Sequence, residues 1–140
     1  MEDPDTTWEP YDISDLPDIR ANNLCGSEYR QCVMIDQQTM FVMTCYDYVF
    51  KIGFDPVQVA MLSQSGLLVG SFSMYYGSEG DDFVYILGGR STETDEKVST
   101  CRKYNIKTDQ WEYVPGMKEK REKPGVLLSE DQNTLYAFGG

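Results

Sequence analysis

The chain has 140 residues, of which 41% are hydrophobic and 13% are aromatic. A disordered chain could not bury so many aromatic side chains, so the composition predicts an ordinary globular domain. Twenty-three acidic residues against twelve basic ones give a formal net charge of -11. Nucleic acid is therefore not an expected partner, because its phosphates would be repelled.

Membrane, secreted and metal-binding proteins are also disfavoured, because the sequence lacks their features. No apolar run approaches the roughly 20 residues that a membrane span needs, and the start, M-E-D-P-D-T-T-W, is acidic where a secretory signal would be basic and then apolar. The four cysteines form no C-x-x-C pair, and the chain has no histidine, the commonest general base and metal ligand. We therefore expect a soluble, cytoplasmic protein with reduced thiols, no membrane contact, no metal and no other cofactor.

Short β-rich runs recur along the chain with a period of about fifty residues. Trp8, Val59 and Trp111 occupy corresponding places in successive copies. The stretch F-D-P-V-Q-V-A-M-L parallels Y-N-I-K-T-D-Q-W, which sets Phe54 at the place of Tyr104. The earlier copy is less regular than the later one.

A pair of glycines closes two of these runs. F-V-Y-I-L is followed by Gly88 and Gly89, and L-Y-A-F by Gly139 and Gly140, 51 residues further on. In the first copy we expect residues 44–45 to take the same place.

Four short strands are predicted within the clear copy, at residues 66–74, 83–88, 98–106 and 110–114. Their residues are β-branched or aromatic, and turn-rich pieces at 76–81, 90–97 and 115–124 separate them. Four antiparallel strands in each of several repeats are typical of the blades of a β-propeller.

The block from Phe83 to Met117 resembles a kelch repeat. It contains V-Y-I-L-G-G, then Tyr104, then Trp111 seven residues on, followed by V-P-G-M and an arginine. The N-terminal W-E-P-Y-D-I-S-D-L-P-D-I-R is similar to that tail, so the resemblance covers residues 8 to 140. It implies an all-β fold, a kelch-type β-propeller fragment of four-stranded antiparallel blades. The residues that carry the motif are Trp8, Arg20, Tyr85, Gly88, Gly89, Tyr104, Trp111, Met117, Arg121, Tyr136, Gly139 and Gly140.

The resemblance also implies an organisation along the chain. We expect a tail (1–7), an outer strand of a closing blade (8–20), a degenerate blade (21–64), a full kelch blade (65–115) and the first half of the next blade (116–140). Because a propeller needs roughly four to eight blades, we expect this chain to be a fragment of a longer propeller. The alternative is that several chains assemble into one ring. Either way the remainder of the propeller is an expected partner.

Packing explains the motif residues. Glycine has no Cβ, so it permits close backbone approach and positive φ at the end of a strand. Tyr104 and Trp111 can each cover a large apolar area on neighbouring strands and still form a hydrogen bond through the polar tip.

Kelch propellers mostly serve as protein-interaction platforms, so the resemblance implies a protein partner that is bound through the loops of one rim, without catalysis. The candidate contact residues lie between the second and third strands: Arg90, Glu93, Asp95, Glu96 and Lys97. The connections at 117–123 and 16–23 are expected on the same rim. The run K-E-K-R-E-K within the former is mixed in sign and is predicted to be a solvated turn.

Two alternatives remain open. The chain could be the N-terminal part of a propeller enzyme, such as a kelch-like oxidase that binds copper through His and Tyr, with its catalytic residues beyond residue 140. It could instead be a cytoskeleton-associated scaffold. No catalytic residue is assigned, since the paired acids at 81–82 and 95–96 flank turns without a convergent partner. Redox sensing by Cys101 is also disfavoured, because Arg102 and Lys103 point to opposite faces of a strand.

Overall fold

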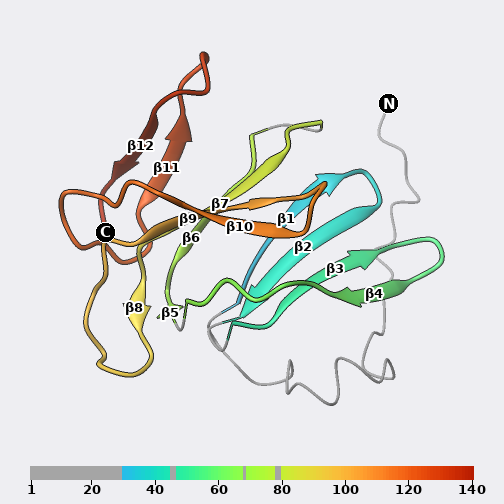
Figure 1. Ribbon diagram of the computed structural model, residues 1–140, viewed down its shortest axis with the longest axis horizontal. Helices are drawn as coiled ribbons and strands as arrows, with labels where there is room; N and C mark the ends of the chain where they lie inside the picture. Colours follow the sequence, from blue (N-terminus) through green and yellow to red (C-terminus); the bar gives the residue numbers. More distant parts are fainter. Residues whose placement is uncertain (1–29, 45–46, 68, 78–79) are drawn as a thin grey trace, which may run out of the picture.

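The computed structural model describes residues 30–44, 47–67, 69–77 and 80–140, and within them the regular secondary structure consists of β-strands (Figure 1). The all-β prediction is confirmed. No helix among these residues could span a membrane. The expected tail and closing outer strand, with Trp8 and Arg20, lie outside the described residues, as does the expected rim connection at 16–23.

The first sheet is a four-stranded antiparallel meander. It consists of β1 (Arg30–Asp36), β2 (Thr39–Thr44), β3 (Val49–Gly53) and β4 (Gln58–Met61), in that spatial order. Because side chains alternate along a strand, Phe41 and Met43 point to one face and Val42 to the other.

The second sheet repeats this arrangement. Its strands are β6 (Ser73–Tyr75), β7 (Phe83–Leu87), β9 (Cys101–Asn105) and β10 (Gln110–Val114), in the order β10-β9-β7-β6. A two-stranded third sheet pairs β11 (Gly125–Leu128) with β12 (Leu135–Phe138). A short ribbon pairs β5 (Val69–Gly70) with β8 (Arg90–Ser91). The first two sheets confirm the expected four antiparallel strands per repeat.

The predicted strand bounds hold at two places and fail at two. The strand at 110–114 is observed, and that at 83–88 ends one residue early, at Leu87. A single strand at 66–74 is wrong: Ser71 has a φ of 52°, which interrupts the ladder, and β5 pairs with β8 while β6 pairs with β7. The strand predicted from residue 98 begins at Cys101, because the Val98 N–H donates to the Gly89 carbonyl instead of extending the ladder.

Equivalent hydrogen bonds align the first two sheets. The N–H of Thr44 donates to Tyr48 O at 2.9 Å, and that of Gly88 to Thr100 O at 2.9 Å. Thr44 therefore takes the place of Gly88, as expected, while residue 45 lies outside the described residues.

Strand register corrects one parallel between the copies. Ile52 pairs with Val59 as Tyr104 pairs with Trp111, so Ile52 corresponds to Tyr104. The parallel between Phe54 and Tyr104 is wrong by two residues: Phe54 follows the end of β3, in the turn, where it corresponds to Ile106.

The first two sheets pack face to face. One apolar core contains Phe41, Met43 and Val49 from the first sheet, together with Val84, Ile86 and Tyr104 from the second. The rings of Phe41 and Tyr104 are 5.0 Å apart between centroids. Burying a side chain such as Phe41 stabilises the fold by roughly 2–3 kcal/mol.

The contacts of β1, β6 and β11 show the order in which the three sheets are stacked. Each begins its sheet, and β6 contacts β1 on one side and β11 on the other. The three sheets are thus packed one against the next in chain order (Figure 1). Successive propeller blades have this arrangement.

The two outer faces of this stack differ. On the first sheet, Val42, Phe50 and Ile52 form a second buried cluster opposite the core. On the third sheet, Leu127, Tyr136 and Phe138 are each more than half exposed.

Candidate functional site

The glycine pair Gly88-Gly89 lets two loops approach the end of β7. Both residues have positive φ, 61° and 111°. A Cβ on Gly89 would lie 2.6 Å from Gly70 O, and one on Gly88 would lie 2.9 Å from the Met117 Cε. The Gly89 N–H donates to Arg121 O at 2.8 Å. The expected close backbone approach at this pair is confirmed.

The second glycine pair holds the same loop from the other side. The Arg121 guanidinium donates to Gly139 O at 2.6 Å, and a Cβ on Gly140 would lie 2.7 Å from Glu122 O. The connection at 117–123 is therefore clamped between the ends of β7 and β12.

Tyr104 and Trp111 anchor the connection between the first and second sheets, named here the linker (residues 62–67). The Trp111 Nε1–H donates to Ser63 O at 2.7 Å. The Tyr104 hydroxyl donates to Asp109 Oδ1 at 2.9 Å, and Asp109 also accepts from the backbone and the hydroxyl of Ser63, both at 3.0 Å. Both aromatic side chains thus pack through their rings and form a hydrogen bond through their polar tips, as expected. Trp111 bonds to the linker directly, and Tyr104 through Asp109.

Two pKa shifts follow from this contact. Burial, together with the hydrogen bond to the Asp109 carboxylate, raises the pKa of Tyr104 far above its usual range. Desolvation would raise the pKa of Asp109, but hydrogen bonds from Ser63 and Tyr104 to the charged form outweigh it and lower that pKa.

Asp47, from the first sheet, holds the other end of the linker. Its buried carboxylate accepts from the N–H groups of Ser65 and Gly66, both at 2.7 Å, and from the Ser65 hydroxyl. Nothing in the sequence singles out Asp47, although an aspartate that accepts from backbone N–H groups commonly fixes a turn.

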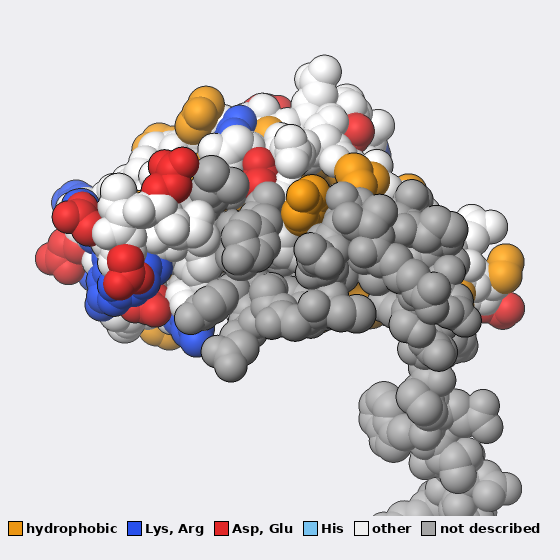
Figure 2. Space-filling view, turned by 90° about the horizontal axis from the view of Figure 1, so that it is seen from below, with side chains coloured by type: hydrophobic (Ala, Val, Ile, Leu, Met, Phe, Trp, Pro, Cys, Tyr) orange, Lys and Arg blue, Asp and Glu red, His pale blue; other side chains and the backbone are white. Residues whose placement is uncertain are grey.

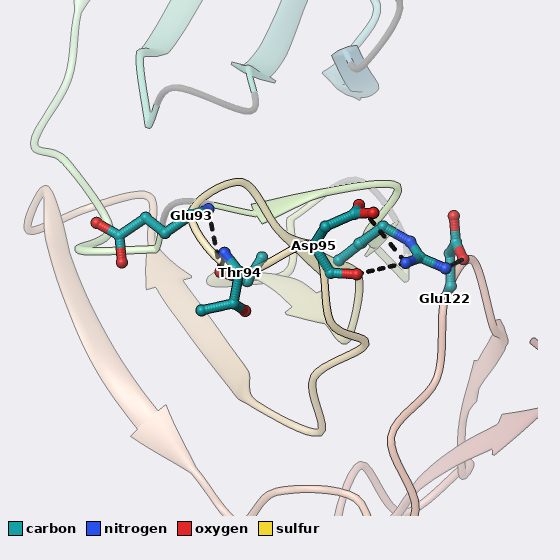
Figure 3. Close-up of polar contacts among 6 residues, drawn as sticks. Glu93, Thr94, Asp95 and Glu122 are labelled. Carbon is teal, nitrogen blue, oxygen red and sulfur yellow. Dashed lines mark hydrogen bonds and ion pairs between the residues drawn. The ribbon is translucent and has the colours of Figure 1, made fainter.

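The loop at 90–97 is ordered by Arg90 and Ser91. The Arg90 guanidinium lies 3.5 Å from the Asp95 carboxylate and 3.3 Å from that of Glu122, and also donates to Asp95 O. The Ser91 hydroxyl accepts from the N–H groups of Glu93 and Thr94, both at 3.2 Å. Figure 3 shows Asp95 and Glu122 on either side of this network, with the Glu93 carboxylate directed away from it.

The loops at 90–97 and 117–123 lie together, and we call them the rim loops. Glu96 lies 3.6 Å from Lys120, the Arg121 N–H donates to Val98 O, and Lys97 donates to Gly140 O at 3.3 Å. Desolvation would raise the pKa of Glu122, but the Ser71 hydroxyl and Arg90 outweigh it and lower that pKa. Figure 2 shows acidic and basic side chains interspersed in one charged cluster on this side of the molecule.

The structure thus brings some of the motif residues together and leaves others apart. Gly88, Gly89, Met117, Arg121 and the pair at 139–140 meet at the rim loops, whereas Tyr104 and Trp111 lie at the linker. Tyr85 is half-buried on β7, and Tyr136 is exposed on β12. The binding role of Arg90, Glu93, Asp95, Glu96 and Lys97 stays a prediction.

The described ranges offer few candidates for metal binding or for cysteine thiol chemistry. They contain no group of three or more His, Cys, Asp or Glu side chains that could hold a metal ion. Cys32 is exposed and Cys101 buried, both as free thiols, and burial raises the pKa of Cys101. Lys103 pairs with Glu112 at 3.1 Å.

The antiparallel sheets are packed one against the next in chain order, which defines the class of the protein as all-β and propeller-like. The family model described as Kelch motif matches residues 81–118, which run from the start of β7 through β10 to the rim. The chain therefore contains a kelch motif, and its all-β antiparallel sheets fit a kelch-type propeller fragment. No curated protein matches the chain. Kelch repeats generally mediate protein–protein interactions, which favours a non-catalytic interaction module.

Proposed function

We propose that this protein is a protein-binding platform whose partner is bound by the rim loops. The observation that supports this most is that two loops from different repeats form one exposed, internally tied surface. Residues 92–96 are all exposed, yet their backbone is fixed by Ser91 and Arg90.

Preorganisation favours binding at such a surface. A loop that is already ordered loses less conformational freedom when a partner docks, so more of the contact energy appears as affinity. Charges of both signs, held at fixed positions, select a partner with the complementary arrangement. Glu93 is the foremost contact candidate, because its carboxylate is directed away from the Arg90 network (Figure 3). The other candidates in the same loop are Arg90, Asp95, Glu96 and Lys97.

The test is a comparison of loop variants of the full chain as affinity baits. Glu93→Gln combined with Glu96→Gln should weaken each purified, directly binding partner by about tenfold or more. The matched control is Glu130→Gln with Asp131→Asn, in the distant β11–β12 turn, which removes the same charge. If every direct partner binds the rim variant as tightly as the control, the contact surface lies elsewhere.

We also propose that the exposed face of the third sheet is covered by a further blade. The strand registers place Phe41, Tyr85 and Tyr136 at equivalent positions. In the first sheet this position is covered by the second sheet, where Phe41 is 1% exposed, whereas Tyr136 is 54% exposed. The remainder of a propeller, from the same polypeptide or another, is the occupant that this equivalence favours.

A cytosolic location is part of the proposal. The free thiols of Cys32 and Cys101 are typical of a reducing compartment. Imaging of the tagged protein tests this, and accumulation in a secretory compartment would contradict it.

A further inference from the structure

Arg102 has no polar protein partner among the residues that the structure describes. It lies on β9, where its Cζ is 4.1 Å from the ring centroid of Tyr113 and 5.8 Å from that of Trp111. In the part of the chain that the structure describes, its guanidinium makes no ion pair, and its Nε is buried without a hydrogen-bond acceptor. Arg90 and Arg121, by contrast, each form an ion pair and donate a hydrogen bond to a backbone carbonyl.

A guanidinium in this state is unusual. Arginine carries a permanent charge and five N–H donors, and a buried donor without an acceptor costs on the order of 1–3 kcal/mol. The cation–π contact with the Tyr113 ring gives the N–H groups no oxygen or nitrogen acceptor.

In the described ranges no acceptor binds the N–H groups of this guanidinium. Gly66 of the linker faces the guanidinium, and a Cβ there would lie 3.2 Å from its Nη1. The two carboxylates that bind the linker are already engaged: Asp47 by Ser65 and Gly66, and Asp109 by Ser63 and Tyr104.

The adjoining surface is apolar and accessible. Tyr113 is 76% exposed, the most exposed of the large hydrophobic side chains described. It lies on β10, which forms one edge of the second sheet (Figure 1). The Arg102 cation therefore lies over an exposed aromatic ring on a strand that is an edge strand among the described residues.

We propose that Arg102 and Tyr113 form a second recognition site, which binds an Asp or Glu carboxylate of a protein partner with an apolar residue beside it. The site deepens the proposed interaction function and rests on it. A carboxylate matches the edge of the guanidinium formed by the two Nη groups, which unlike Nε are not buried, through two parallel hydrogen bonds. The apolar neighbour covers Tyr113.

Charge favours a carboxylate over a phosphate here. The site offers one unpaired cation, since Lys103 is on the opposite face and pairs with Glu112 at 3.1 Å. A dianionic phosphate would require further donors, and the formal net charge of -11 opposes a second negative charge.

The experiment follows the Nε–H signal of Arg102 by NMR in the full, isotope-labelled chain. The probes are acetyl-Phe-Glu-amide, its isosteric control acetyl-Phe-Gln-amide, and inorganic phosphate. We expect the Glu peptide to shift the Arg102 Nε–H and the Tyr113 ring signals in a saturable way that added salt weakens. The Gln peptide should bind at least about tenfold more weakly, as should phosphate.

Variants separate recognition from folding. Arg102→Gln should abolish the shift of the Tyr113 ring, and Arg102→Lys should weaken binding several-fold because it keeps the charge but loses the planar fork. Tyr113→Ala removes an exposed side chain and tests the apolar contact in a folded protein. Lys107→Gln, at the β9–β10 turn, is the control of equal charge change and should bind like the wild type.

Three results would overturn the proposal: equal binding of the Glu and Gln peptides, tighter binding of phosphate, or unchanged binding to Arg102→Gln. Failure of the Arg102 proposal can be distinguished from failure of the proposed rim-loop function. Partners that depend on Glu93 would remain if only the Arg102 site were wrong. The Glu peptide would still bind Arg102 if the rim loops had no partner.

Discussion

The first and second sheets reach the same fold by different means. Both have four antiparallel strands in the same order, with matching hydrogen bonds at the ends of β2 and β7. The first, however, has Ile52, Val59 and Thr44 where the second has Tyr104, Trp111 and Gly88. Alternating apolar residues are therefore enough to form such a sheet, and the motif residues must contribute something else.

What they contribute is the connection between sheets. Tyr104 and Trp111 place polar tips on the linker, and Gly88-Gly89 admits the following rim loop. Ile52 and Val59 can only pack. The motif residues of the second sheet hold its neighbours in place, and four experiments examine this difference.

The largest effect is expected where an equivalent position is covered in one sheet and open in another. Phe41→Ala should lower the free energy of unfolding by about 3–5 kcal/mol, because it leaves a cavity against Tyr104. Tyr136→Ala, at the equivalent exposed place on β12, should cost less than about 1 kcal/mol. Urea denaturation of both variants measures this. Similar losses would show that Tyr136 is covered in solution.

A slightly smaller effect is expected at the glycine pair. Gly89→Ala should destabilise by about 2–4 kcal/mol, because its φ is 111° and the new Cβ would meet Gly70 O. The matched control is Gly53→Ala on β3, where a Cβ would meet nothing within 4 Å. Thermal unfolding of the two variants measures the difference. A Gly89→Ala protein as stable as the control would mean that the glycine pair does not set the approach of the rim loop.

A loss of about 1 kcal/mol is expected from Tyr104→Phe. The substitution keeps the aromatic packing against Phe41 and removes the hydroxyl that donates to Asp109. Amide hydrogen exchange should increase at Ser63, whose N–H donates to the same carboxylate. Unchanged protection at Ser63 would contradict a role of Tyr104 in holding the linker.

The smallest effect is a pH dependence due to Asp109. Its pKa in the folded protein lies below its usual value of about 4. Its stabilising contribution is therefore full above that usual value and is lost as pH falls through the folded pKa. Its exposure limits the contribution to less than about 1 kcal/mol. The difference in unfolding free energy between wild type and Asp109→Asn should be constant from pH 5 to 7 and shrink below pH 4.

The local parts of the fold could be predicted from the sequence. The strand at 110–114, the end of β7 at a glycine pair, and the packing roles of Tyr104 and Trp111 depend on neighbouring residues and on the kelch spacing. The break at Ser71 could not be foreseen, because it arises when β5 pairs with β8 rather than with β7.

By itself, the sequence determined that the chain forms repeated antiparallel sheets, because the alternation and turn residues that specify them lie within each repeat. Only the tertiary structure decided which groups meet between repeats. Ser63 and Asp109 are 46 residues apart, and nothing in the local pattern of either indicates the other. Arg102 likewise shows its lack of an acceptor only once the linker and β10 are in place around it, since hydrogen bonding in a folded protein depends on distances that chain order does not fix.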